Sequence, residues 1–308
     1  MKKVFIDGSA GTTGLRIKDR LSGRADIELI TLPEEERKLA SARSAAINAA
    51  DIVFLCLPDD AAREAVAMCE DPDTVILDTS TAHRTDPRFA YGFPELSAEH
   101  KEKIINSKRI AVPGCHASGF IALVYPLIKA GIIDKGELLT CMSLTGYSGG
   151  GKKMIADYEA EGRDPLLGAP RQYGLSQSHK HLPEMCAQTG LENPPVFMPV
   201  VGDFYSGMEV TVPLHLSQVK GGIEAVRAAY ADTYREGLVH FDGDVAEGGF
   251  LSALSYSGKD DMHVTVHGNG ERIILTARYD NLGKGASGAA VECMNLVLGV
   301  DYTTGLDV

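Results

Sequence analysis

The sequence has no tryptophan, no C-x-x-C pair among its cysteines and no long uninterrupted apolar run. Its longest apolar stretch, residues 119–133, contains Pro126 and Lys129, so it is too short and too interrupted to span a bilayer. Without C-x-x-C spacing, the common cysteine metal and redox sites are not indicated. Six cysteines lie scattered through apolar segments, as is typical of thiols in a reducing compartment: Cys56, Cys69, Cys115, Cys141, Cys186 and Cys293.

Basic residues are scarce relative to acidic ones. The 308 residues include 30 lysines and arginines against 42 aspartates and glutamates, which gives a net charge of −12. Such a chain repels nucleic acid and anionic membranes, so an anionic ligand must be held by local basic residues and backbone N–H groups. Residues 1–7 run into a strand-like segment without the apolar core of a secretory signal. We therefore expect a cytoplasmic protein with no nucleic-acid or membrane partner.

The first third of the chain alternates apolar runs with helical patterns. Its predicted strands are continuously apolar, which indicates a parallel sheet covered on both faces, the doubly wound α/β pattern. The predicted strands are residues 4–6, 27–32, 50–57, 74–77 and 109–112, and the predicted helices are 12–21 and 60–70.

The middle of the chain has a different pattern. Residues 208–212 alternate between apolar and polar, and Asn269-Gly270 between residues 263–267 and 272–279 predicts a β-hairpin. These features favour an antiparallel α+β domain. A helix over residues 286–298, rich in small residues, is expected to return to the first domain. We predict a nucleotide-binding domain over 1–114, a catalytic α+β domain over 115–285 and a returning segment over 286–308.

A glycine-rich turn follows the first predicted strand and opens the first predicted helix. Its G-x-x-G-x-x-G spacing differs from the G-x-G-x-x-G of many dinucleotide sites, but its position suits a pyrophosphate held at a helix N-terminus. A tight turn without a ligand is the alternative. The candidate cofactor residues of this turn are Gly8, Ser9, Gly11, Thr12, Thr13 and Gly14.

The segment after the second predicted strand bears on the choice of nucleotide. A carboxylate there would bind the ribose hydroxyls of NAD, and residues 34–36 are acidic. Arg37 and Lys38 follow at once and could hold the 2′-phosphate of NADP. The residues alone leave both nucleotides open, with a preference for NADP.

Cys115 is the candidate nucleophile among the six thiols. It lies between a predicted strand and an apolar helix expected from about residue 118 to 127. Ligands of doubly wound sheets bind at the carboxyl ends of strands, and a helix N-terminus favours the thiolate. The alternative is that Cys115 is a small capping residue, and the other five cysteines are interpreted as buried hydrophobic residues.

A nucleophilic cysteine needs an acid or base partner. His116 is adjacent in sequence, and residues 178–184 form a polar cluster that contains His179, His181 and Glu184. A zinc site is the rival interpretation of this cluster, but no further ligands at familiar spacing accompany it, so we expect no metal.

These segments together resemble the N-acetyl-gamma-glutamyl-phosphate reductase family, in the shorter of its two forms. The resemblance covers nearly the whole chain. The order of its motifs along the chain is more specific than any single motif. It is carried by residues 8–14, 78–84, 91–95, 113–115, 146–153, 179–184 and 281–288.

The resemblance implies a Rossmann domain and a second α+β domain like that of the semialdehyde and glyceraldehyde-3-phosphate dehydrogenases. It also implies NADP, an acyl phosphate substrate, a place in arginine biosynthesis and a homotetramer. Cys115 inherits the role of nucleophile, and His179 or His181 that of acid/base. Arg84 inherits a phosphate-binding role, although the longer form usually has an aromatic residue where this chain has His83. Ser148 and Gly149 are expected to bind substrate, and Asn281 to lie against the nicotinamide.

The implied activity is NADPH-dependent reduction of N-acetyl-L-glutamyl 5-phosphate to the 5-semialdehyde, with release of phosphate, through a thioester on Cys115. Aspartate-semialdehyde dehydrogenase or another acyl-phosphate reductase is the alternative within the same chemistry. A non-catalytic NADP-sensing protein is the alternative from another class, but a sensor has no need of a nucleophilic cysteine.

Overall fold

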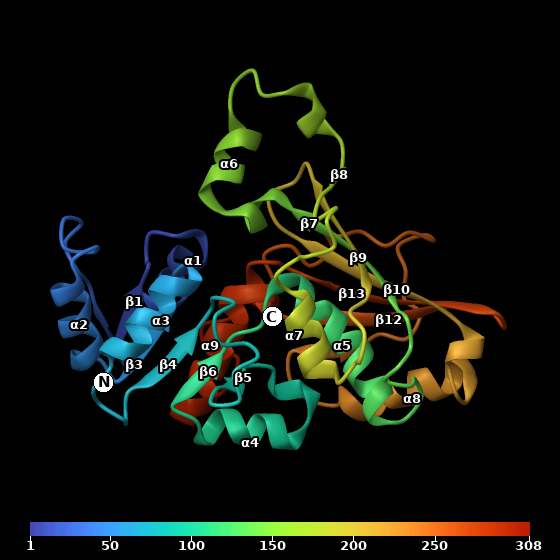
Figure 1. Cartoon of the computed structure of the whole chain (residues 1–308), viewed down its shortest axis with the longest axis horizontal. Coiled ribbons are helices and arrows are strands. Elements are labelled where there is room, and N and C mark those ends of the chain that lie inside the picture. Colours follow the sequence, from blue (N-terminus) through green and yellow to red (C-terminus); the bar gives the residue numbers. More distant parts are fainter. The chain divides into compact units, whose positions relative to one another are not determined.

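A computed structural model describes all residues from 1 to 308, and the chain divides into two compact units. The first unit comprises Met1–Pro94, Ala98–Gly114 and Ala286–Asp307, and the second comprises Glu95–Ser97, Cys115–Gly285 and Val308. Figure 1 shows the elements of each unit coloured along the chain. No helix is both long and apolar enough to cross a bilayer.

The first unit contains a six-stranded parallel sheet in the order β2-β1-β3-β4-β6-β5. Its strands are β1 (Lys2–Asp7), β2 (Ile27–Ile30), β3 (Ile52–Leu55), β4 (Val75–Asp78), β5 (Ala90–Tyr91) and β6 (Arg109–Ala111). The order reverses at β1, so β1 and β3 form the switch point at which such sheets bind ligands. The predicted doubly wound parallel sheet is confirmed.

Helices cover both faces of this sheet, as the continuous apolar strands require. Alternate residues of β1 enter different cores: Val4 and Ile6 pack with α1 and α9, whereas Phe5 packs with α2 and α3. The helices of this unit are α1 (Thr12–Leu21), α2 (Ala40–Ala49), α3 (Asp59–Met68), α4 (Ala98–Asn106) and α9 (Gly288–Leu298).

The second unit contains a seven-stranded mixed sheet in the order β11-β12-β13-β10-β7-β9-β8. Its centre is antiparallel, but β7 pairs with β9, and β11 with β12, in parallel. The strands are β7 (Thr140–Gly146), β8 (Arg171–Gln172), β9 (Val196–Gly202), β10 (Met208–His215), β11 (Val239–Phe241), β12 (Met262–Gly268) and β13 (Arg272–Tyr279). The predicted second α+β domain is confirmed, with a mixed rather than wholly antiparallel sheet.

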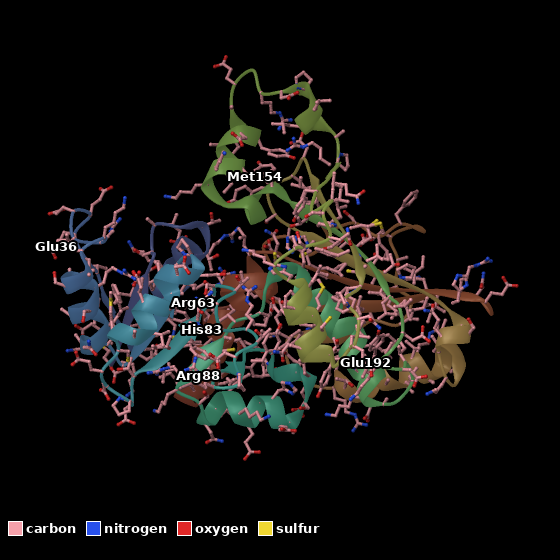
Figure 2. The ribbon with its side chains drawn as sticks, viewed as in Figure 1. Glu36, Arg63, His83, Arg88, Met154 and Glu192 are labelled. Carbon is pink, nitrogen blue, oxygen red and sulfur yellow. The ribbon has the colours of Figure 1, made fainter.

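Three helices of the second unit pack together on this sheet. They are α5 (Cys115–Lys129), α7 (Leu182–Thr189) and α8 (Gly222–Thr233); α5 contacts β10, β13 and both other helices. Between β7 and β8 the chain makes an excursion that carries α6 (Gly151–Glu159), on which Met154 lies (Figure 2). A small core of Tyr158, Leu167 and Val201 stabilises this excursion.

The predicted hairpin joins β12 to β13, but Asn269-Gly270 is not its central pair. The backbone N–H of Asn269 donates to Arg272 O at 2.9 Å, so Gly270 and Glu271 occupy the centre. The Asn269 side chain accepts from the backbone N–H groups of Glu271 and Arg272. Asn269 therefore stabilises this turn through its side chain.

Candidate active site

Cys115 is the first residue of α5, three positions earlier than the predicted start of that helix. The hydroxyl of Tyr279, on β13, donates to Cys115 O at 2.5 Å and accepts from Gly119 N at 3.0 Å. Gly285 also lies against this position, since a Cβ there would be 3.1 Å from Cys115 Cβ. The first turn of α5, and with it the half-buried Cys115, is thereby fixed to the end of β13.

Three of the other thiols have raised pKa values. Burial raises the pKa of Cys56 to about 12, and it also raises the pKa values of Cys141 and Cys186. A higher pKa leaves less thiolate near neutral pH, and the thiolate is the reactive form. Of the five cysteines interpreted as buried hydrophobic residues, Cys141 and Cys293 are buried, whereas Cys56, Cys69 and Cys186 are half-buried.

His116 is buried, and both of its ring nitrogens are engaged. Nδ1 lies 2.7 Å from Ser143 Oγ on β7, and Nε2 lies 2.7 Å from the hydroxyl of Tyr173. Burial, with smaller effects from His179 and Lys180, lowers the pKa of His116 to about 3. The ring is therefore neutral near pH 7 and positions its neighbours rather than donating protons.

His179 and His181 lie close to His116 just before α7. Ring centroids are 5.6 Å from His116 to either ring and 4.8 Å between the pair. His179 Nδ1 accepts from the backbone N–H of His181 at 3.3 Å, which leaves its Nε2 for a ligand. Burial and the charge of Lys180 lower the pKa of His179, whereas His181 is almost fully buried. The structure brings both predicted histidines together and leaves the choice between them open.

Ser148, Gly149 and Asn281 also meet in the second unit. Asn281 Nδ2 donates to Ser148 Oγ at 3.0 Å, and Asn281 Oδ1 accepts from Gly207 N at 2.9 Å. A Cβ on the exposed Gly149 would lie 3.5 Å from Asn281 Nδ2. The Asn281 side-chain amide thus stabilises the loop after β7. The predicted ligand-binding roles of Ser148, Gly149 and Asn281 stay predictions.

Arg84 is buried in the first unit. Its Nε donates to Val112 O at 2.9 Å and its Nη2 donates to Thr79 O at 2.8 Å. These carbonyls follow β6 and β4, so Arg84 ties together the carboxyl ends of two strands. Val112 precedes Cys115 by only three residues in the chain. The phosphate-binding role of Arg84 stays a prediction, and the observed contacts show that it supports the backbone before the candidate nucleophile.

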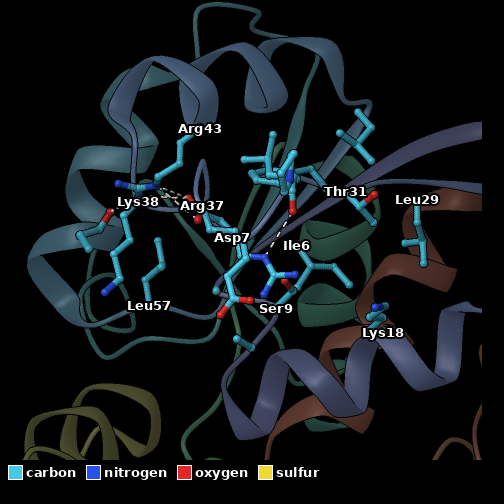
Figure 3. A pocket seen from close by; sticks show the side chains of 18 residues that line it. Ile6, Asp7, Ser9, Lys18, Leu29, Thr31, Arg37, Lys38, Arg43 and Leu57 are labelled. Carbon is cyan, nitrogen blue, oxygen red and sulfur yellow. Dashed lines mark hydrogen bonds and ion pairs between the residues drawn. The ribbon is translucent and has the colours of Figure 1, made fainter.

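A pocket of about 840 Å³ lies at the carboxyl end of β1 in the first unit (Figure 3). Gly8 and Ser9 of the glycine-rich turn and Arg37 line it, as predicted from the sequence, whereas Gly11, Thr12, Thr13 and Gly14 are not among its lining residues. Three further cations line it: Lys18, Lys38 and Arg43. Arg43 is paired with the buried Asp7 at 3.0 Å. The positive charges of Lys18, Arg37 and Lys38 therefore remain to balance the negative charges of Glu34 and of an anionic ligand.

The glycine-rich turn fits a phosphate at the start of α1. Gly8 has a φ of +86°, and a Cβ there would lie 2.2 Å from Cys56 O, so the turn itself requires this glycine. Gly11 precedes the helix with a φ of −74°, and a Cβ would meet only Gly8 O at 3.4 Å. Thr12 Oγ1 is buried with no hydrogen-bond partner. A ligand phosphate would satisfy such a hydroxyl.

Several site residues were not found from the sequence. Tyr173, Ser143 and Tyr279 reach the start of α5 from segments far along the chain, and no local spacing distinguishes them from core residues. Lys18 was predicted only as part of a helix, because the sequence does not distinguish it from the other lysines. Asp7 was also missed, although a charged residue that ends an apolar strand is a recognisable signal.

Family models match both units of the chain. Residues 9–104 match the NAD binding domain of semialdehyde dehydrogenases, and residues 115–281 match the semialdehyde dehydrogenase dimerisation domain. A Rhizobium meliloti (strain 1021) protein named N-acetyl-gamma-glutamyl-phosphate reductase is 46% identical over 96% of this chain and 98% of its own. The chain belongs to the N-acetyl-gamma-glutamyl-phosphate reductase family. A Pseudomonas putida member of that family, N-acetyl-gamma-glutamyl-phosphate reductase 2, is 43% identical over 96% of both chains.

Solved structures outside this reductase family share its fold. An aspartate semialdehyde dehydrogenase from Vibrio cholerae superposes with a TM-score of 0.72 over 97% of this chain and 98% of its own, at 18% identity. A probable aspartate-semialdehyde dehydrogenase from Pseudomonas aeruginosa gives 0.72 at 15% identity, over 96% and 98% of the two chains. Identities this low show the fold alone. The reductase family is therefore favoured over the aspartate-semialdehyde alternative.

Proposed function

We propose that this chain reduces N-acetyl-L-glutamyl 5-phosphate to N-acetyl-L-glutamate 5-semialdehyde with NADPH and releases phosphate. Full-length similarity to reductases of that name supports the substrate. The observation that carries the mechanism is that α5 begins at Cys115, with its first turn fixed by Tyr279 and with His179 and His181 close to the adjacent His116. The reaction would serve arginine biosynthesis in the cytoplasm.

The first unit would hold the cofactor in the pocket at the end of β1. Gly8 and Ser9 would bind the pyrophosphate near the start of α1. The positive charges of Lys18, Arg37 and Lys38 would favour the 2′-phosphate of NADP. NADPH, when bound, supplies the hydride that reduces the acyl group. Gly11, Thr12, Thr13 and Gly14 would contribute through the backbone and the Thr12 hydroxyl, and Asn281 through the loop that it holds.

Cys115 would capture the substrate covalently. Its thiolate attacks the acyl carbon, the bond from carbon to phosphate oxygen breaks, and the electron pair leaves with phosphate, giving a thioester. Arg84, Ser148 and Gly149 are the residues that we assign to substrate and phosphate. The N–H groups at the start of α5 would stabilise the oxyanion. Sulfur suits the step because a thioester accepts hydride more readily than an oxygen ester and its thiolate then leaves.

One of His179 and His181 would act as the acid/base. After reduction, the histidine donates a proton either to the sulfur as the carbon–sulfur bond breaks or first to the oxygen. In the second case the histidine takes that proton back as the carbon–sulfur bond breaks, so that the aldehyde forms and the electron pair returns to Sγ. His116 is set apart from this role because both of its nitrogens are engaged and its pKa is near 3.

The test is phosphate-dependent reduction of NADP with N-acetylglutamate semialdehyde, the reaction run in reverse. Cys115→Ser should fold normally and lose nearly all turnover. His179→Gln and His181→Gln should separate the pair, because the acid/base variant loses kcat and flattens the pH profile, whereas the other variant mainly alters KM. Cys186→Ser is the matched control and should stay active. Substantial turnover in Cys115→Ser would refute the covalent mechanism.

We also propose a homotetramer. The second unit matches a domain described as a dimerisation domain, which supports self-association through that unit. Light scattering coupled to size-exclusion chromatography would give the number of chains, and a monomer at micromolar concentration would contradict the assembly.

A further inference from the structure

Two histidines and an aspartate converge at the β11 edge of the second sheet. His240 lies on β11, Asp261 immediately precedes β12 and His263 lies on β12. One ligand atom from each lies within 4.8 Å of the others. His263 Nε2 is 3.1 Å and His240 Nε2 is 3.9 Å from Asp261 Oδ2. The three side chains therefore bring two imidazole nitrogens and a carboxylate oxygen close together.

This cluster is separate from the Cys115 site. Met262 pairs with Tyr279, whose hydroxyl reaches Cys115 on the helix-covered face of the sheet. Successive side chains of a strand point to opposite faces, so His263 points to the other face. The activity proposed above makes no use of His240, Asp261 or His263.

Asp242 fixes the orientation of the His263 ring. Its Oδ2 lies 2.7 Å from His263 Nδ1, and the ring of Tyr256 stacks on the imidazole at 3.8 Å between centroids and 8° between planes. Nε2 is thereby directed toward Asp261 and His240. Metal-binding histidines are commonly held in this way, with a carboxylate on the nitrogen that does not face the metal.

Asp261 supplies a second, independent indication of a cation. The residue is 9% exposed, and its Oδ1 is buried without a hydrogen-bond partner. A buried carboxylate oxygen is costly unless a donor or a cation satisfies it. Two imidazole nitrogens with one carboxylate oxygen match the ligand preference of zinc and similar divalent transition metals, whereas calcium and magnesium prefer oxygen ligands alone.

We propose that His240, Asp261 and His263 bind one divalent transition metal ion, with zinc as the best match, and that Asp242 positions His263 in this site. Zinc bonds of about 2.0–2.2 Å place its ligands roughly 3.3 Å apart. The His263–Asp261 pair is already at 3.1 Å. Only the ring of His240, whose side chain is 44% exposed, has to approach, and water would complete the coordination. The ion would attach the three-residue edge strand β11 to β12.

Equilibrium dialysis of the full chain against zinc chloride tests the proposal. A Cys115→Ser background prevents that thiol from offering a competing site. The parent should bind one zinc per chain, and His240→Ala, Asp261→Asn and His263→Gln should each weaken binding at least tenfold. Asp242→Asn should weaken it about 10–100-fold, as is typical for a residue that orients a ligand. Zinc should raise the Tm of the parent and not that of the three ligand variants.

His267→Ala is the matched control, because His267 lies on the same strand and face as His263 but outside the cluster. It should keep full zinc binding. His240→Ala removes a half-exposed side chain and should fold. If the other ligand variants fail to fold, zinc binding by His240→Ala alone tests the proposal. A parent that binds no zinc, or ligand variants that bind it as the parent does, would overturn the proposal in favour of a protonated His263 held between two carboxylates. Either result leaves the reductase assignment untouched.

Discussion

Three imidazole rings lie near the start of α5, and they differ in what their nitrogens can do. Both nitrogens of His116 are engaged and its pKa is about 3, so it stays neutral. His179 keeps Nε2 for a ligand, and His181 is almost fully buried. The histidine next to Cys115 in sequence is thus poorly suited to proton transfer. Hydrogen bonding and burial, rather than proximity along the chain, set these roles.

Arg37 should determine cofactor selectivity at the scale of one side chain. It is exposed in the pocket at the end of β1, with its Nε donating to Leu32 O at 3.3 Å. A charge-assisted hydrogen bond to a 2′-phosphate is worth about 1.5–3 kcal/mol. Arg37→Ala should therefore raise the KM for NADPH roughly tenfold or more and leave the KM for NADH nearly unchanged, as steady-state kinetics with both nucleotides would measure.

Arg88→Ala is the matched control for charge. Arg88, which Figure 2 labels, is exposed, is paired with Asp86 and does not line the pocket, so its removal should change neither KM. Equal effects of Arg37→Ala on both nucleotides would remove Arg37 from the 2′-phosphate site.

At the scale of the element, the first turn of α5 depends on one tyrosine. The Tyr279 hydroxyl bonds both Cys115 O and Gly119 N. Tyr279→Phe should lower stability by about 1 kcal/mol through the lost hydrogen bonds. It should also lower kcat and slow alkylation of Cys115 by iodoacetamide, because the sulfur is no longer held in position.

Tyr230→Phe, in α8, provides a control that removes a different hydrogen bond to α5. Its hydroxyl donates to Leu123 O at 2.6 Å, in the middle of α5, so the variant loses a comparable bond away from Cys115. It should lose stability and keep the alkylation rate. If both variants slowed alkylation equally, a general loosening of α5 would explain the effect.

Elements with a strong local pattern were predictable from the sequence. The helix Thr12–Leu21 was predicted with its observed bounds, and five of the six strands of the first sheet were found from their apolar runs. The strand β5 was missed, because its two residues form no apolar run. α2 and α4 were missed because small or charged residues weaken their periodicity. Cys115 and the histidine pair lie in local segments and could be singled out, whereas Tyr173 and Tyr279 come from distant segments and needed the fold.

For the whole molecule, buried neutral histidine makes stability depend on pH. In the unfolded chain His116 takes up a proton near its ordinary pKa of 6.5, whereas in the folded chain it does so only near pH 3. The unfolded state therefore binds more protons between these values, and the free energy of unfolding falls as pH falls through this window, by up to about 1.4 kcal/mol per pH unit. Above pH 6.5 this contribution is fully present.

Urea unfolding of the wild type and of His116→Asn at pH 7.5, 6.0 and 5.0 would measure this dependence. The variant should be less stable at pH 7.5 and should lose less stability on acidification, so the two curves converge. His179, whose pKa is also lowered, retains part of the slope in both proteins. Parallel curves would show that His116 is not a source of the pH dependence.

The first unit is built from both ends of the chain, and this bears on the order in which the protein can be made. Side chains of α9, among them Ala290, Val291 and Met294, share one core with Val4 and Ile6 of β1. A ribosome delivers β1 first and α9 only after all of Cys115–Gly285 has emerged. The second unit has nearly all of its residues in one continuous stretch. During synthesis one face of the β1 core therefore stays uncovered until α9 is made, while the second unit can already fold.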